Sequence, residues 1–346
     1  MRRRLPLLLV SMLVSGMAGT MVIAAAGAAP AEPGRPLPDT AVTGVHNAYV
    51  KATFPHLVDA LESGTGMIEL DIWQNFLGSR HYVVGHSALP DNNCVAATRY
   101  EQLRTGWRNR SLARCLDDIR LWHQHSPDHP PLILKLEMKN GFDDRHGFGP
   151  DEFDRLLADK LGAATVFTPA DLLGGRYPDA DTASRAGAWP SREELRGRII
   201  VLVQRGTFEQ DNPLDHYHTE LEYADHLAAL AAAGRISSAM MFPTVLSRAT
   251  AADPRTGELG GTRKPWYVSF DASATAWMRV DTGFYTAGHY LLTMTAAHAV
   301  EPPIDAHAPT PEQAAERLRL LAGHGASVVS SDWTAPGVLG LTAPRS

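Results

Sequence analysis

The chain has 346 residues, of which 44% are hydrophobic and 20% are charged, and its formal net charge is −6. After residue 4 it contains no cluster of lysines and arginines. A mildly acidic chain of this kind has no general electrostatic attraction to nucleic acid or to anionic lipid, so we expect no nucleic-acid partner.

The first 31 residues have the pattern of a secretory signal peptide. Three arginines precede a long uncharged run, which ends in the small residues Ala29-Pro30-Ala31. This sequence offers an A-x-A cleavage site, although the run is also long enough for a membrane anchor. Cleavage would remove the three arginines and change the formal net charge from −6 to −9. We therefore predict a secreted protein with a signal peptide (1–31), a flexible mature N-terminus (32–39) and one folded domain (40–346).

Apolar runs rich in β-branched residues alternate with amphipathic stretches along the remaining chain. The runs lie at 41–46, 66–73, 81–86, 131–138, 198–204, 266–270, 290–295 and 326–331. The helical stretches lie at 54–62, 111–124, 151–161, 220–233 and 311–323. About eight strands alternating with helices predict an α/β fold of the (β/α)8 TIM-type barrel class, possible for a domain of this length. A doubly wound open sheet is the alternative, but no glycine-rich phosphate fingerprint follows the first run.

Polar side chains occur where several of these runs end. In chain order they are His46 and Asn47, Glu69 and Asp71, His86, and Glu137. Barrel enzymes place their chemistry at the carboxyl ends of the strands. A single residue of this kind is more often structural, but their occurrence at equivalent ends of four runs indicates a site.

Glu69 and Asp71 lie two positions apart in the run GMIELDIW, so both project from the same face of a buried strand. Two carboxylates cannot stay ionised in a dry core without a cation or several hydrogen bonds. Together with Asn47 and Glu137 they offer the oxygen ligands that Ca²⁺ prefers, with Mg²⁺ and Mn²⁺ as weaker options. His46 and His86 would remain available for proton transfer.

The chain has two cysteines, Cys94 and Cys115, both after the export signal. An even pair in an exported protein predicts a disulfide that closes a loop of about 20 residues and contributes roughly 3 kcal/mol. A zinc site would need further ligands, and His123 and His125 are poorly spaced for one.

Four motifs resemble the X-box of the calcium-dependent phosphoinositide-specific phospholipases C. They are VHNAYV (45–50), ELDIW (69–73), VGH (84–86) and ILKLEMK (133–139). The family pattern is H-N-x-Y, then E-L-D-x-W, then a second histidine, then a strand that ends in L-x-L-E. The resemblance covers roughly residues 42–139, and ASVVSSDW (326–333) is similar to the last strand of this barrel superfamily. The chain looks like the secreted bacterial single-domain type.

The resemblance implies that Ca²⁺ is the cofactor and that the inositol 2-hydroxyl attacks its own 1-phosphate. The products would be diacylglycerol and inositol 1,2-cyclic phosphate. Glu137 or Glu69 would accept the hydroxyl proton, His46 would donate to the phosphoryl oxygens, and His86 would protonate the departing glycerol oxygen. The resemblance gives the ligands of Ca²⁺ as Asn47, Glu69, Asp71 and Glu137.

The expected substrate is phosphatidylinositol in a membrane or vesicle surface. Eukaryotic relatives bind the 4- and 5-phosphates with lysines on a later strand, whereas residues 195–206 supply Arg205 and no lysine. Lys135 lies on the same strand face as Glu137 and would either contact the phosphate or act as a buried partner of the carboxylates. We expect a monomer that touches the lipid surface transiently.

Two alternatives to this function remain open. One is another metal-dependent phosphodiesterase of the same superfamily, acting on glycerophosphodiesters or sphingomyelin-type lipids. The other is a non-catalytic binder of phospholipid head groups, although a pure binder needs no pair of histidines.

Trp73, Phe76 and Leu77 follow the Glu69–Asp71 strand and would either dip into the lipid interface or pack beneath a neighbouring loop.

Overall fold

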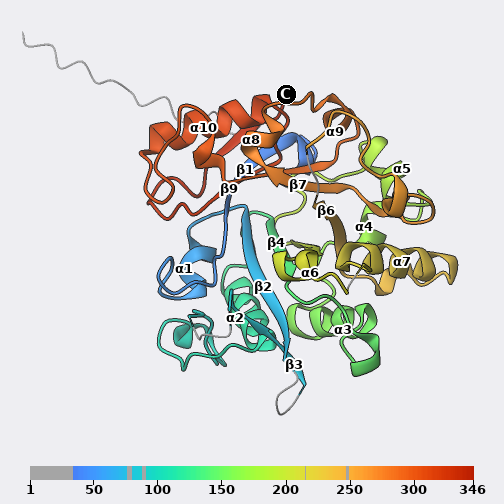
Figure 1. Ribbon diagram of the computed structural model, residues 1–346. Helices are drawn as coiled ribbons and strands as arrows, with labels where there is room; N and C mark the ends of the chain where they lie inside the picture. Colours follow the sequence, from blue (N-terminus) through green and yellow to red (C-terminus); the bar gives the residue numbers. More distant parts are fainter. Residues whose placement is uncertain (1–33, 76–79, 88–90, 215, 247–248) are drawn as a thin grey trace, which may run out of the picture.

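The computed structural model describes residues 34–75, 80–87, 91–214, 216–246 and 249–346, and its centre is a closed barrel of parallel strands (Figure 1). Each barrel strand pairs in parallel with the next, and β1 closes the ring by pairing with both β9 and β2. The predicted (β/α)8 class is therefore confirmed. The barrel strands are β1 (Thr40–Val45), β2 (Met67–Asn75), β4 (Leu132–Met138), β5 (Ile199–Arg205), β6 (Phe242–Leu246), β7 (Ser269–Ser273), β8 (Leu291–Thr295) and β9 (Val328–Ser331).

Among the described residues, two strands lie outside the ring, and one of them corrects the sequence prediction. The run at 81–86 was expected to be a barrel strand, but β3 (His81–Val84) pairs antiparallel with β2 and forms a hairpin with it. The eighth barrel strand is instead β6, which the sequence did not predict, because it is short and contains Pro243. The run expected at 266–270 also begins later, since β7 starts at Ser269. The other strand outside the ring, β10 (Thr342–Pro344), pairs antiparallel with β1.

The five expected helical stretches are confirmed within a few residues, and the helices lie around the barrel (Figure 1). In α10, Ala314, Leu318 and Leu321 are buried at helical spacing, so one face packs on the barrel. The helices are α1 (Leu57–Glu62), α2 (Leu112–His125), α3 (Pro150–Leu161), α4 (Pro169–Leu173), α5 (Ala180–Arg185), α6 (Thr207–Asp211), α7 (Thr219–Ala232), α8 (Ala274–Trp277), α9 (Gly283–Ala287) and α10 (Pro311–Gly323). Short 3₁₀ turns lie at Leu37–Asp39, Tyr100–Gln102, Asp144–His146, Ile236–Ser238, Gly257–Leu259, Lys264–Trp266 and Ala297–Ala299.

The pairing of β2 with β4 stacks polar residues in layers inside the barrel. Glu69 is the register partner of Lys135, and Asp71, two residues further along β2, is the partner of Glu137. The intervening residue Leu70 is fully buried and points to the opposite face, because side chains alternate along a strand. The barrel therefore presents charged side chains inward on these two strands and apolar ones toward the helices.

The beginning of the described chain packs against the barrel. Leu37 is buried, and its N–H donates a hydrogen bond to the carbonyl of Pro190. This part of the expected flexible segment 32–39 is therefore attached to the fold. The predicted signal peptide, residues 1–31, lies outside the described residues. Within the part of the chain that the structure describes, no helix is both long enough and apolar enough to span a bilayer.

The predicted disulfide is present. Cys94 and Cys115 are bonded and fully buried, with their Cα atoms 5.1 Å apart. The bond attaches the long segment that follows β3 to the first half of α2.

Candidate active site

Three carboxylates converge at the mouth of the barrel, and two of them are buried while that of Glu137 is partly exposed. Glu69, Asp71 and Glu137 each offer an oxygen, and these oxygens lie within 4.8 Å of one another. Glu69 and Asp71 are each only 1% exposed. Burial raises the pKa of Glu69 to about 7 against the opposing effect of Lys135, and burial also raises the pKa of Asp71. Such a cluster of acidic groups needs a cation to stay ionised together.

Several polar atoms of this cluster have no hydrogen-bond partner among the described residues. They are Oδ1 of Asn47, Oε2 of Glu69 and Oδ1 of Asp71, and all are buried. Asn47 is the second residue after β1 and has a φ of 51°, a left-handed conformation that asparagine tolerates better than most residues. Buried oxygens without partners are costly, and Ca²⁺ takes about six to eight oxygen ligands. The donor set therefore fits a calcium ion.

Two lysines also enter the cluster, and they contact different carboxylates. Nζ of Lys135 lies 2.5 Å from Oδ2 of Asp271 and 3.5 Å from Oε2 of Glu69. Nζ of Lys139 lies 2.9 Å from Oδ2 of Asp71 and pairs with Glu137. Lys135 thus has the position expected of a buried partner. The sequence interpretation missed both Asp271 on β7 and the location of Lys139.

His46 forms a second, adjacent group with a residue from the far end of the chain. Its Nδ1 atom lies 2.8 Å from Oδ1 of Asp332, which directly follows β9. Burial lowers the pKa of His46, but the hydrogen bond to Asp332 and the charge of Glu69 outweigh it and raise the pKa to about 9. Sequence analysis missed Asp332, although ASVVSSDW contains it at the end of a predicted strand.

His86 lies two residues after the β2–β3 hairpin. Gly85 donates from its N–H to the carbonyl of Asp71 at 3.1 Å, which fixes this segment beside β2. His86 is exposed. Together with Lys139, Trp73 and Phe208, it lines a cavity of about 310 Å³. His86 therefore shares a cavity with Lys139, whose ammonium contacts two of the three carboxylates.

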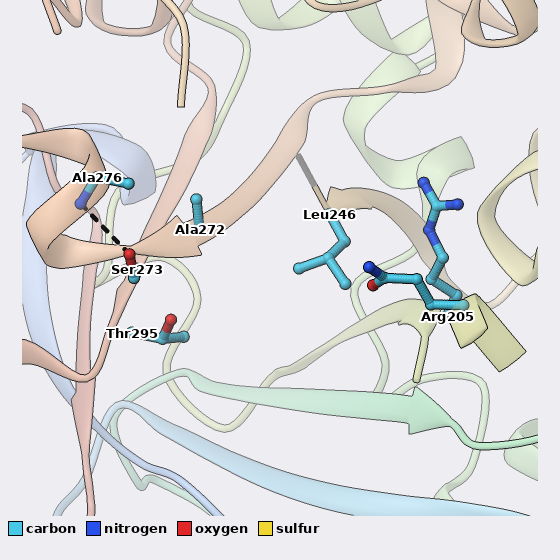
Figure 2. Close-up of a pocket in the computed structure, with 7 residues that line it drawn as sticks. Arg205, Leu246, Ala272, Ser273, Ala276 and Thr295 are labelled. Carbon is cyan, nitrogen blue, oxygen red and sulfur yellow. Dashed lines mark hydrogen bonds between the residues drawn. The ribbon is translucent and has the colours of Figure 1, made fainter. Parts of the chain in front are cut away.

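Arg205 lies apart from the carboxylate cluster, at the carboxyl end of β5. It lines a cavity of about 480 Å³ at the ends of β5 to β8 (Figure 2). The other lining residues shown in Figure 2 are small or uncharged: Leu246, Ala272, Ser273, Ala276 and Thr295. The guanidinium of Arg205 pairs with the buried Glu220, with Nη2 and Oε1 2.8 Å apart.

Comparison with known proteins identifies related sequences and structures. The family model of calcium-dependent phosphoinositide phospholipase C matches residues 102–231. A calcium-dependent phosphatidylinositol-specific phospholipase C from Streptomyces antibioticus is 42% identical, with a TM-score of 0.84 over 90% of this chain and 99% of that chain. A calcium-dependent phosphoinositol-specific phospholipase C from Pseudomonas sp. is 17% identical, with a TM-score of 0.66 over 90% of this chain and 95% of that chain, and so shares the fold. No curated protein sequence matches closely enough to count as a relative.

Proposed function

Because the chain belongs to the family of calcium-dependent phosphoinositide phospholipases C, we propose that it cleaves phosphatidylinositol between glycerol and phosphate. The main support within the molecule is the group of three carboxylate oxygens within 4.8 Å, beside buried oxygens without hydrogen-bond partners. The ligands of Ca²⁺ would be Asn47, Glu69, Asp71 and Glu137. Bound there, the ion would lower the pKa of an inositol hydroxyl and offset charge on the phosphoryl oxygens.

The attacking group in this proposal is a ring hydroxyl next to the phosphate, the 2-hydroxyl in the reaction that the resemblance implies. Its proton would pass to Glu69 or Glu137, since both carboxylates belong to the cluster. The phosphate would become a cyclic diester as the bond to glycerol breaks, and diacylglycerol would leave.

The two histidines would act on opposite sides of the phosphate. His46, protonated at neutral pH because of Asp332, would donate to the non-bridging phosphoryl oxygens. His86 would give a proton to the departing glycerol oxygen, because it is exposed at a cavity that it shares with Lys139 of the cluster. In this proposal the inositol ring would lie over the ends of β5 to β8 and the lipid toward the β2–β3 hairpin.

We propose that the inositol ring of the substrate is not phosphorylated at positions 4 and 5. Of the described residues that line the cavity in Figure 2, Arg205 alone has a charge, and its guanidinium is paired with Glu220. A site for two additional phosphates would need several cations with unmatched charge. Ser273 and Thr295 offer hydroxyls suited to hydroxyl groups of a sugar-like ring.

We further propose that the enzyme is secreted, acts as a monomer and meets its substrate at a lipid surface through an apolar rim beside the active site. Trp73 packs on Phe208 with ring centroids 5.3 Å apart, and Phe208 is 56% exposed. Leu214, three residues after α6, is 92% exposed. Burying such side chains in the lipid interface lowers the free energy of the bound state. An acidic protein needs this contribution, because anionic lipids do not attract it. Phe76 and Leu77, expected to join this rim, lie outside the described residues.

One product analysis tests this function against the alternatives. Vesicles of phosphatidylinositol, its 4,5-bisphosphate, phosphatidylcholine and sphingomyelin, together with a soluble glycerophosphodiester, are each incubated with the protein in calcium and in excess chelator. We expect calcium-dependent release of diacylglycerol from phosphatidylinositol, with a cyclic inositol phosphate whose ring is identified by phosphorus NMR. Cleavage of another substrate alone would refute the proposal, and binding without cleavage would identify a head-group binder.

A further inference from the structure

Lys139 occupies the acidic centre of the barrel mouth. Its Nζ atom lies 2.9 Å from Oδ2 of Asp71 and pairs with Glu137, and its side chain is 5% exposed. We propose that the ammonium of Lys139 competes with Ca²⁺ for these carboxylates, so that it must leave them when the ion binds and thereby sets the calcium affinity. This inference rests on the proposed calcium site.

The competition follows from the small size of the site. The oxygens of Glu69, Asp71 and Glu137 lie within 4.8 Å of one another, and Lys139 contacts two of these carboxylates. A calcium ion takes about six to eight oxygens at about 2.3 to 2.6 Å and needs these carboxylates among them. Two cations at such short range in a buried site repel each other strongly. The ion and the ammonium therefore cannot both hold the same oxygens.

The net charge of the cluster is also consistent with replacement of the Lys139 ammonium by Ca²⁺. The cluster contains the buried carboxylates of Glu69, Asp71 and Asp271, the partly exposed carboxylate of Glu137, and the buried ammonium groups of Lys135 and Lys139. When all are ionised, the cluster has an excess of two negative charges, which a divalent ion neutralises. Lys135 keeps its contact with Asp271, whereas Lys139 shares both of its partners with the ion. Removing the charge of Lys139 would leave three negative charges and bind the ion more tightly.

A cavity beside Lys139 can receive its ammonium group when the ion binds. Lys139 lines the cavity of about 310 Å³ that contains His86, and its flexible four-carbon stem allows the ammonium to turn there without backbone movement. Gly206 leaves room for the stem, since a Cβ at that position would stand 2.9 Å from Cδ of Lys139 and 3.0 Å from Oε1 of Glu137. In the proposed function this cavity lies on the side of the departing glycerol, where His86 acts.

Two substitutions separate the charge of Lys139 from its bulk. Lys139→Met keeps the length of the side chain and removes the charge, whereas Lys139→Arg keeps the charge. Lys51→Met, at an exposed position after β1, is the control for loss of a lysine near the same rim. Calcium affinity is measured by titration calorimetry, and melting temperature is measured in excess chelator and in saturating calcium.

We expect Lys139→Met to lower the Kd for Ca²⁺ about tenfold or more, because a competing cation is lost. Its melting temperature in chelator should fall by about 5 °C or more, since Asp71 and Glu137 lose their counter-ion, and the deficit should close in saturating calcium. Lys139→Arg and Lys51→Met should keep the wild-type Kd within about threefold.

An unchanged Kd in Lys139→Met would overturn the competition, and so would an unchanged melting temperature in chelator. If Lys139→Met folds only in the presence of calcium, that result supports the proposal, because the ion then replaces the missing ammonium. Wild-type protein that binds no calcium at all would instead refute the calcium site of the proposed function. The two failures are therefore distinguishable.

Discussion

His46 and Asp332 are separated by 286 residues in the chain, yet Nδ1 of the imidazole lies 2.8 Å from Oδ1 of the carboxylate. The two residues directly follow β1 and β9, the strands whose pairing closes the barrel. The carboxylate fixes the orientation of the ring and favours its protonated form, as expected of a positioning residue beside a proton donor.

Asp332→Asn should reduce kcat/KM roughly 10²-fold with little change in melting temperature, because His46 loses the partner that orients and charges it. Since Asp332 raises the pKa of His46, its removal should lower that pKa and move the alkaline limb of the pH–rate profile to lower pH. Rates measured from pH 5 to 10 check this. Asp332→Glu should restore part of the activity, and an unchanged profile in Asp332→Asn would show that the contact is only structural.

His46→Ala and His86→Ala should each lower turnover by a factor on the order of 10² to 10⁴. A substrate with a good leaving group should rescue His86→Ala more than His46→Ala, because a stable alkoxide needs no proton. The comparison uses phosphatidylinositol and an inositol aryl phosphate, with melting temperatures as the control for folding. Equal rescue of both variants would refute the assigned roles.

Glu69→Gln should weaken calcium binding and lower turnover severely, because the ion loses one of three carboxylates. Calorimetric titration and the rise in melting temperature on adding calcium measure this directly, apart from catalysis. The substitution keeps the size of the side chain, so the barrel should still fold. Full activity of the wild-type protein in excess chelator would contradict the metal requirement itself.

Phe208→Ser with Leu214→Ser should lower activity on phosphatidylinositol vesicles about tenfold or more, since each buried apolar side chain contributes roughly 1.5 to 3 kcal/mol at an interface. Activity on a short-chain soluble substrate should be retained, and salt should change vesicle binding little. Leu320→Ser on α10 serves as the control, because Leu320 is also exposed but lies on an outer helix. Equal losses on both substrates would show that the two residues support catalysis or folding and not contact with the lipid surface.

The sequence predicted those parts of the molecule that are encoded locally. Helical spacing predicted α10, and alternation along one strand placed Glu69 and Asp71 on one face. It could not distinguish β3 from a barrel strand, because an apolar β-branched run has the same pattern in a hairpin. It also did not predict β6, because this strand contains Pro243 and proline is rare within strands.

The missing partners of the site depend on contacts between distant segments. Asp271 meets Lys135 from β7, and Asp332 meets His46 from β9, so each pair exists only once the barrel has closed. Lys139 was visible in the motif ILKLEMK, but only the structure shows that its ammonium reaches Asp71 and Glu137. Spacing along the chain reveals neither kind of contact.

The pairing of β1 with β9 has a consequence for the order of synthesis and folding. The ribosome makes β1 early and β9 late, so a nascent chain that stops before Val328 has His46 but lacks the strand that positions Asp332. On the proposed role of Asp332, catalytic competence appears only when nearly the entire polypeptide has been made and has folded. On the proposed secretion, a precursor kept unfolded for translocation would be inactive inside the producing cell.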